Sequence, residues 1–406
     1  MDNETYIVLR LLDGAPRSLD PSGEPTSKGL ESTDGGGMEV STEQLTDKDY
    51  HDLRRDPKVA SLAPSIPVQL IQPVAEMEAE AEPTPEPDAV ATWGVQATGA
   101  LQSPYTGVGV TVAVLDTGID ATHEAFQGVE LVQKDFTGEG DGDQHGHGTH
   151  VAGTIMGRMV GGLRYSMAPG IKRALIGKVL GSKGGGTTQG IIEAIQWAAK
   201  EGAQIMNMSL GLDFPGLVQA WVKDGLPVDL ATSRALQAYR DNVRFFDRLV
   251  NLLNAGANFG SSALLVAASG NESKRRINPN YVIGVAPPAA TDGILAVAAL
   301  QTPGAPHNNL TVAAFSNSLA TVAAPGVAVY SAKLGGGYFQ LSGTSMASPH
   351  VTGIAALWAE RQLQRNGLIN VQALHAQIEG QASFARLAAG VATSDVGAGL
   401  VVAPLN

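Results

Sequence analysis

The sequence predicts an α/β fold in which a doubly wound, mostly parallel sheet carries helices on both faces, preceded by a small α+β domain. Short apolar runs at 110–115, 174–180, 263–268 and 294–298 indicate strands that are buried on both faces, which is typical of parallel sheets. Helical patterns at 189–200 and 345–364 alternate with such runs. In sheets of this kind, active sites form at the carboxyl ends of the strands.

The predicted N-terminal domain covers residues 1–72. Residues 5–12 and the short runs 59–62 and 68–71 have the composition of strands, and a long Gly/Ser/Pro-rich loop follows the first of them. Ser41 with Gln44 three residues later resembles a capping box and predicts a helix over about 42–55.

An acidic, proline-rich segment at 73–88 separates this domain from the remainder, 89–406. Alternating glutamates and then alternating prolines favour an extended linker rather than a core. The charge is unevenly distributed: the first 90 residues hold 19 acidic and 7 basic side chains, whereas the rest of the chain holds 20 of each. The N-terminal part therefore reads as a separate, acidic unit.

Composition excludes several classes of protein. The chain has no cysteine, so disulfide scaffolds, thiolate metal sites and cysteine nucleophiles are excluded. The acidic balance argues against a nucleic-acid partner. No apolar stretch reaches the ~18 residues that a membrane span needs, so we expect no membrane partner. The acidic start lacks the features of a secretory signal, which favours a cytoplasmic location and leaves non-classical export open.

Three segments each carry one candidate catalytic group. Asp116 closes an apolar run and precedes Thr-Gly, which by itself is also how an ordinary turn begins. His147 lies in a glycine-rich segment with two more histidines; a zinc site would need further ligands, and no His-Glu-x-x-His pattern occurs. Ser345 comes two residues after Gly343, at a predicted helix start, a place where a serine is otherwise most often an N-cap.

Together the three segments resemble the signatures of the subtilases, the subtilisin-like serine peptidases. The matching segments are Asp116–Asp120, His147–Thr154 and Gly343–Val351, and they stand in that family's order. Further matches lie at 168–169, 207–211, 324–326 and 397–401, so that the resemblance covers about residues 89–405. It implies a serine endopeptidase that acts on polypeptides through an acyl-enzyme, with no cofactor required for the chemistry.

The resemblance also assigns roles to residues. Asp116, His147 and Ser345 would form the catalytic triad, and Asn271 in Ser269-Gly-Asn-Glu272 would donate to the oxyanion. The segment Ser209-Leu210-Gly211 would bind substrate as an added strand.

Calcium, which many members of the family bind, is left open. The acidic residues between Glu139 and Asp143 could offer carboxylates. However, the loop 156–166 lacks the Asn and Asp ligands of the common family site, and Ala125 stands where an Asp ligand is often found. Metal ligands therefore remain unknown. Residues 277–290 diverge from the family pattern, so cleavage specificity cannot be transferred.

The N-terminal domain resembles the inhibitory propeptides of subtilases in size and in its α+β pattern. We expect it to fold on the catalytic domain, to place residues 67–72 in the cleft, and to be released by self-cleavage in the linker. A longer helical segment at about 212–262 reads as an enlarged core helix rather than a cap over the cleft.

Two alternatives to an active peptidase stay open. One is a catalytically silent subtilase fold that serves as a binding module. The other is a lipase or esterase, which is disfavoured because Gly343–Ala347 lacks the second glycine of Gly-x-Ser-x-Gly and the triad order differs.

Overall fold

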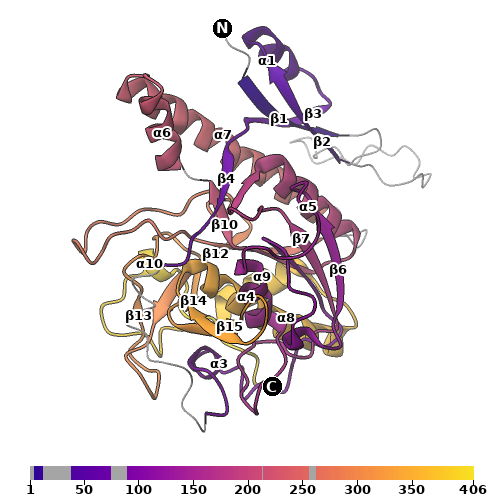
Figure 1. Ribbon diagram of the computed structural model, residues 1–406, viewed down its shortest axis with the longest axis vertical. Coiled ribbons are helices and arrows are strands. Elements are labelled where there is room, and N and C mark those ends of the chain that lie inside the picture. The colour runs from indigo at the N-terminus through magenta and orange to yellow at the C-terminus, as the bar shows by residue number, and fades with distance from the viewer. Residues whose placement is uncertain (1–3, 12–37, 75–88, 213, 256–261) are drawn as a thin grey trace, which may run out of the picture.

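The computed structural model describes residues 4–11, 38–74, 89–212, 214–255 and 262–406. Figure 1 shows a broad body built around a sheet, with a smaller unit and a helical hairpin standing above it. The loop predicted at 13–37 lies outside the described residues, and so does the linker predicted at 73–88 apart from its first two residues, Pro73 and Val74.

The predicted fold class is confirmed by the central sheet, which has eight strands within the described chain, in the order β13-β12-β11-β9-β5-β7-β6, with β14 paired to β12. All its pairs are parallel except β12 with β13. The strands are β5 (Thr111–Asp116), β6 (Glu130–Asp135), β7 (Arg173–Lys178), β9 (Ile205–Met208), β11 (Leu264–Ala268), β12 (Ile294–Gln301), β13 (Thr311–Val312) and β14 (Val322–Pro325).

Successive residues of each central strand face opposite layers, because side chains alternate across a sheet. Val112 and Val114 pack in a core with α4 (His147–Met156) and α8 (Thr344–Asn366). Ala113 and Leu115 pack in a second core with α5 (Thr188–Lys200) and α7 (Val228–Ala255). This double burial explains why the strands are continuous apolar runs.

The remaining elements of the body lie at the edges of these layers. They are α3 (Trp93–Ala97), the 3-10 turn η1 (Glu124–Phe126), β8 (Gly185–Thr187), β10 (Leu210–Leu212), the β15 (Val329–Ala332) and β16 (Tyr338–Leu341) hairpin, α9 (Val371–Gln381) and α10 (Thr393–Val396). Within the described ranges, no helix combines the length and hydrophobicity that crossing a bilayer requires.

The N-terminal unit, residues 4–11 and 38–64, is an antiparallel sheet with one helix. Its strands are β1 (Glu4–Leu11), β2 (Met38–Leu45) and β3 (Val59–Pro64), with β1 in the middle. The helix α1 (Asp47–Leu53) begins after Thr46, which forms a capping box with Asp49. The expected N-cap at Ser41 is therefore wrong: Ser41 lies within β2, where its hydroxyl binds Glu43. Pairing with β1 prevails over the local capping signal.

The N-terminal unit rests on α5 and α7. Ile7 and Leu9 are fully buried and belong to the same core as Phe245 and Phe246 of α7. At the edge of the contact, Asn242 Nδ2 donates to the carbonyl of Pro64 at 3.0 Å. The unit is thus packed by apolar contacts and fixed by at least one partly buried hydrogen bond.

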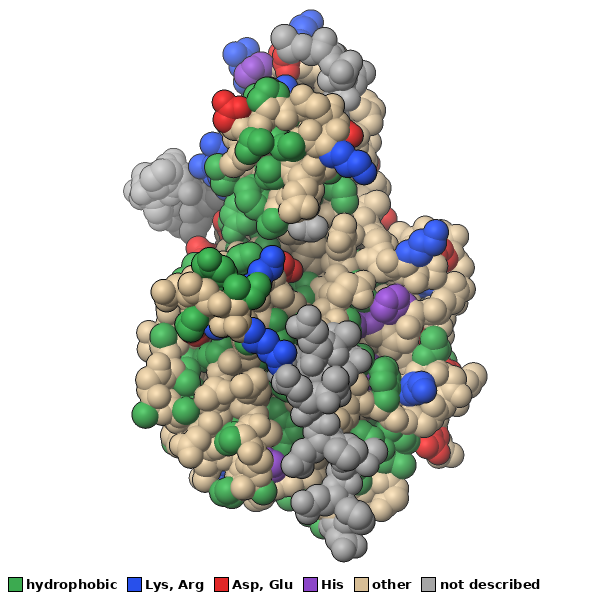
Figure 2. All heavy atoms as spheres, turned by 60° about the vertical axis from the view of Figure 1, so that its left-hand side comes forward, with side chains coloured by type: hydrophobic (Ala, Val, Ile, Leu, Met, Phe, Trp, Pro, Cys, Tyr) green, Lys and Arg blue, Asp and Glu red, His purple; other side chains and the backbone are tan. Residues whose placement is uncertain are grey.

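The segment 212–262 contains two helices in its described part, α6 (Phe214–Lys223) and α7, which form a hairpin that projects beside the N-terminal unit (Figure 1). The predicted long amphipathic helix over 233–253 is confirmed as part of α7. In Figure 2, apolar side chains lie on both the narrow upper part and the broad lower part of this face, and charged side chains are scattered among them.

Candidate functional site

Asp116 and His147 meet where β5 ends and α4 begins. The His147 Nδ1–Asp116 Oδ1 distance is 2.8 Å, and the two side chains are almost fully buried. The backbone N–H of Thr117 donates to the same carboxylate oxygen at 2.8 Å. The arrangement orients the imidazole so that Nε2 is the free nitrogen.

Glycines allow the two turns that carry these residues to touch. A Cβ on Gly148 would lie 2.2 Å from the carbonyl oxygen of Gly118. Gly118 has a φ of 106°, and a Cβ at this position would lie 2.5 Å from the Gly142 carbonyl oxygen. The contact between Asp116 and His147 therefore requires glycine at both 118 and 148.

Ser345 and Asn271 meet at the start of α8. Asn271 Oδ1 accepts from the Thr344 N–H and the Thr344 hydroxyl, each at 2.9 Å, which leaves its Nδ2 group to face the site. A Cβ on Gly343 would lie 3.0 Å from Asn271 Nδ2 and 3.1 Å from Ser345 Oγ. The two side chains therefore converge on a small space that only a glycine at 343 leaves open.

The expected substrate cleft corresponds to the space between β10 and β8, and the chain's own strand β4 (Pro67–Leu70) fills that space. β4 pairs antiparallel with β10 on one side and with β8 on the other. Gln69 lies opposite Gly211, and Leu70 opposite Leu210, in the segment predicted to bind substrate. Ser209, the third residue of that segment, turns its hydroxyl instead toward the Ser345 carbonyl and Ser348.

Beyond β4 the chain crosses the site itself. Ser345 Oγ donates to the Ile71 carbonyl at 3.1 Å, and Asn271 Nδ2 donates to the Gln72 carbonyl at 2.9 Å. Val74 N–H then binds the Ser342 carbonyl. His147 Nε2 has no hydrogen-bond partner among the described residues, so the serine hydroxyl is engaged by the crossing chain rather than by the imidazole.

The side chains of β4 and of the two residues after it divide into buried and exposed ones. Val68, Leu70 and Ile71 are buried, whereas Gln69 and Gln72 are exposed. Ile71 Cδ1 lies 3.5 Å from where a Cβ on Gly211 would be. Val68 and Leu70 belong to the apolar core that also contains Leu210 and Leu212.

The sequence did not lead us to expect β8 as the second strand that borders the cleft, opposite β10. The Leu70 N–H donates to the Gly184 carbonyl at 2.8 Å, and β8 follows directly. The run Gly184-Gly185-Gly186 was the available signal, because backbone that must approach another strand closely favours glycine.

Three other histidines of the catalytic body are hydrogen-bonded to backbone carbonyls, which is typical of a structural role. His150 Nε2 bonds to the Val329 carbonyl, and burial lowers its pKa to about 3. His350 Nδ1 bonds to the Met346 carbonyl, and burial lowers its pKa to about 4. Both rings are therefore neutral across physiological pH. His123 bonds to the Gly337 carbonyl through Nε2.

The acidic segment considered for calcium does not form a shared site. Glu139 faces Lys178, with an Oε2–Nζ distance of 3.4 Å, and accepts from the Ser182 N–H. Asp143 turns inward and binds groups around His147, while Asp141 is exposed. The carboxylates point to different partners, and no group of three metal-binding side chains occurs in the described ranges.

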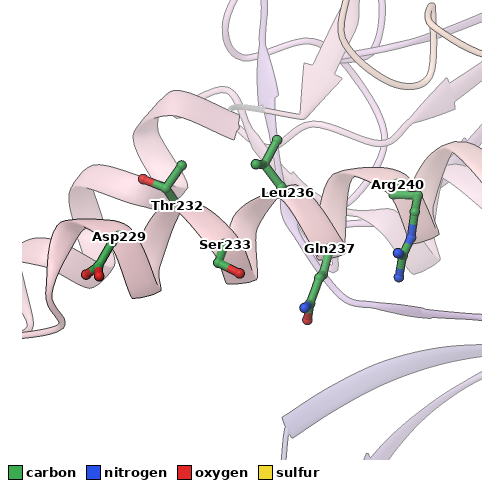
Figure 3. A pocket seen from close by; sticks show the side chains of 6 residues that line it. All are labelled: Asp229, Thr232, Ser233, Leu236, Gln237 and Arg240. Carbon is green, nitrogen blue, oxygen red and sulfur yellow. The ribbon is translucent and has the colours of Figure 1, made fainter.

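A hollow beside the first half of α7 lacks the features of a ligand site. Figure 3 shows its lining residues, with Asp229, Ser233, Gln237 and Arg240 pointing to one side of the helix. All the lining residues come from α7 alone, whereas ligand sites usually gather polar groups from several elements.

Comparison with known proteins agrees with this geometry. The model of the Subtilase family matches residues 107–391. Subtilisin-like protease 6 of Trichophyton verrucosum is 33% identical over 291 residues, and its namesake in Trichophyton equinum is 32% identical over the same length. Each alignment covers 66% of this chain and 58% of the relative, so this chain spans under two thirds of their length. The match to the family model, which extends over more than half of the sequence, shows that the chain belongs to the subtilase family.

Proposed function

We propose that this protein is a serine endopeptidase, made as a zymogen whose N-terminal unit and β4 keep the cleft filled until self-cleavage. One observation carries the proposal. β4 lies between β10 and β8 as an added strand, and it delivers the Ile71 carbonyl to within 3.1 Å of Ser345 Oγ.

In the proposed reaction, Ser345 Oγ attacks the carbonyl carbon of a peptide while His147 Nε2 takes the hydroxyl proton. Asp116 fixes the tautomer and stabilises the imidazolium, which their 2.8 Å contact supports. Asn271 Nδ2 donates to the developing oxyanion. His147 then protonates the leaving amine, and water hydrolyses the acyl-enzyme. No step is assigned to a metal ion or cofactor.

The proposed self-cleavage site is the bond between Ile71 and Gln72, which lies just before the linker at 73–88 where the sequence led us to expect it. The pairing of Gln69 with Gly211 and of Leu70 with Leu210 leads the chain to Ile71, whose carbonyl accepts from the Ser345 hydroxyl. The hydrogen bond from Asn271 to the Gln72 carbonyl would favour the next bond along. That bond leads into Pro73, whose nitrogen is part of a ring and lacks a hydrogen, so we assign cleavage to Ile71–Gln72.

The same contacts account for latency. The Ser345 hydroxyl donates to Ile71, and it must turn toward His147 Nε2 before it can attack. The apolar core shared with α5 and α7 and the contact of Asn242 with Pro64 hold the unit in place. Once the bond is cut, β4 becomes the end of a separable inhibitor.

A fluorophosphonate probe and intact-mass analysis test the proposal together. The wild-type chain should shorten to a product that begins at Gln72, and the probe should then label Ser345. The Ser345→Ala variant, the matched control, should neither shorten nor react. A wild-type protein that stays unlabelled after its N-terminal unit has been removed would favour the silent binding module instead.

A further inference from the structure

We propose that Asp143 is a positioning residue that fixes His147 against Asp116. The inference rests on the proposed peptidase function but concerns a residue that touches neither the substrate path nor the reacting atoms. Asp143 lies four residues before His147 and its side chain is buried, with 8% exposure.

The Asp143 carboxylate binds both elements of the Asp116–His147 pair. Its Oδ1 accepts from the Thr117 hydroxyl at 2.9 Å, and Thr117 directly follows Asp116. Its Oδ2 accepts from the Thr149 N–H at 2.9 Å and from the Thr149 hydroxyl at 2.6 Å, in the first turn of α4. One carboxylate thus ties the end of β5 to the start of the helix that carries His147.

The same carboxylate replaces a missing helix cap. The N-cap residue of α4 is Gly146, which has no side chain to satisfy the free N–H groups of the first turn. Asp143 Oδ1 accepts from the N–H groups of His145 and Gly146, and Oδ2 from that of Thr149. A negative charge at a helix N-terminus is also favoured by the helix dipole.

The hydroxyls around Asp143 extend the connection. Thr117 Oγ1 accepts from the Gly148 N–H at 2.9 Å while it donates to Asp143. Thr149 Oγ1 likewise accepts from the Asp120 N–H at 3.0 Å. Every group that faces Asp143 in these contacts is a donor, so a carboxylate can accept from all of them. An asparagine would turn its own NH2 group toward donors.

Loss of this carboxylate should therefore misplace the imidazole rather than weaken substrate binding. A displacement of about 1 Å at a catalytic group can cost ~10²-fold in rate. We expect kcat for Asp143→Asn to fall by about 10²-fold with KM little changed. Asp141→Asn, which removes the same charge from an exposed position of the same loop, should keep wild-type kinetics.

The test has two arms. In the full-length Ser345→Ala background, the far-downfield proton resonance of the His147 Nδ1–H bond to Asp116 should be lost or shifted in Asp143→Asn and unchanged in Asp141→Asn. In active protein, Thr117→Val should lower kcat, and Thr117→Ser, which keeps the hydroxyl, should restore most of it.

The outcomes separate the two proposals. A wild type that never reacts with the fluorophosphonate probe defeats the peptidase function, while the resonance still reports on positioning. An unchanged resonance and unchanged kcat in Asp143→Asn overturn the positioning role. If Asp143→Asn fails to fold, as judged by circular dichroism, Thr117→Val decides, and wild-type kcat in that variant overturns the proposal.

Discussion

Replacing Val68 by aspartate should release β4 from the cleft without touching any proposed catalytic residue. Val68 is 1% exposed and lies between Leu212 of β10 and Gly186 of β8. It belongs to the apolar core that the N-terminal unit shares with the body. A carboxylate at this position would be buried among apolar groups, and we expect the strand to leave instead.

The magnitude follows from burial. Removing a fully buried valine from apolar contact costs about 1.5–3 kcal/mol. Burying an unpaired carboxylate costs several kcal/mol more. The sum is at least about 4 kcal/mol, which shifts the balance between the filled and the open cleft by about 10³-fold. The open form should then be populated in the uncut chain.

The assay is labelling of Ser345 by a fluorophosphonate probe, followed by intact mass. The wild type should label only after it shortens, whereas Val68→Asp should label at full length and without delay. Gln69→Asp is the matched control, because Gln69 is the next residue of β4 and its side chain is exposed. Equal delays in Val68→Asp and wild type, or equal release by Gln69→Asp, would refute the reasoning.

Three further outcomes are expected. Asn271→Ala should lower kcat by about 10²–10³-fold, the loss known for such an oxyanion donor in a subtilisin, with the fold intact by circular dichroism. Because the pKa values of His150 and His350 are lowered to about 3 and 4, the folded state binds fewer protons than the unfolded state below pH ~6.5. The free energy of unfolding of the Ser345→Ala chain in urea should therefore fall from pH 6.5 toward 4, by about 1.4 kcal/mol per pH unit for each histidine. A slope that stays flat would contradict this. Glu139→Ala removes the partner of the buried Lys178 and frees the Ser182 N–H. It should raise KM for peptides by loosening the loop before β8, whereas a KM equal to that of wild type would contradict that role.

Local patterns failed where pairing with distant strands competed with them. Ser41 and Gln44 had the spacing of a capping box, but both lie in β2, which pairs with β1 over eight residues. The helix starts five residues later, at Thr46 and its partner Asp49. A capping signal contributes about 1 kcal/mol, which a strand with its ladder of hydrogen bonds and its buried face outweighs.

The sequence alone determined the fold class, the family and the identity of the candidate site residues. Strands buried on both faces must be apolar throughout, and turns that contact each other closely must contain glycine. Both features therefore appear as local sequence patterns. Asp116, His147 and Ser345 could be named because each lies within such a segment.

The resemblance to propeptides led us to expect residues 67–72 in the cleft, but only the tertiary structure decided which strands they pair with and what holds the site together. β4 lies between β10 and β8, which are separated from it by more than a hundred residues in the chain, and its four residues contain no local signal of that pairing. Asp143 likewise looks like one acid among several in its loop. It becomes distinct when folding removes it from water and surrounds it with donors from β5 and α4. Partners of this kind are chosen by three-dimensional proximity, which no local pattern encodes.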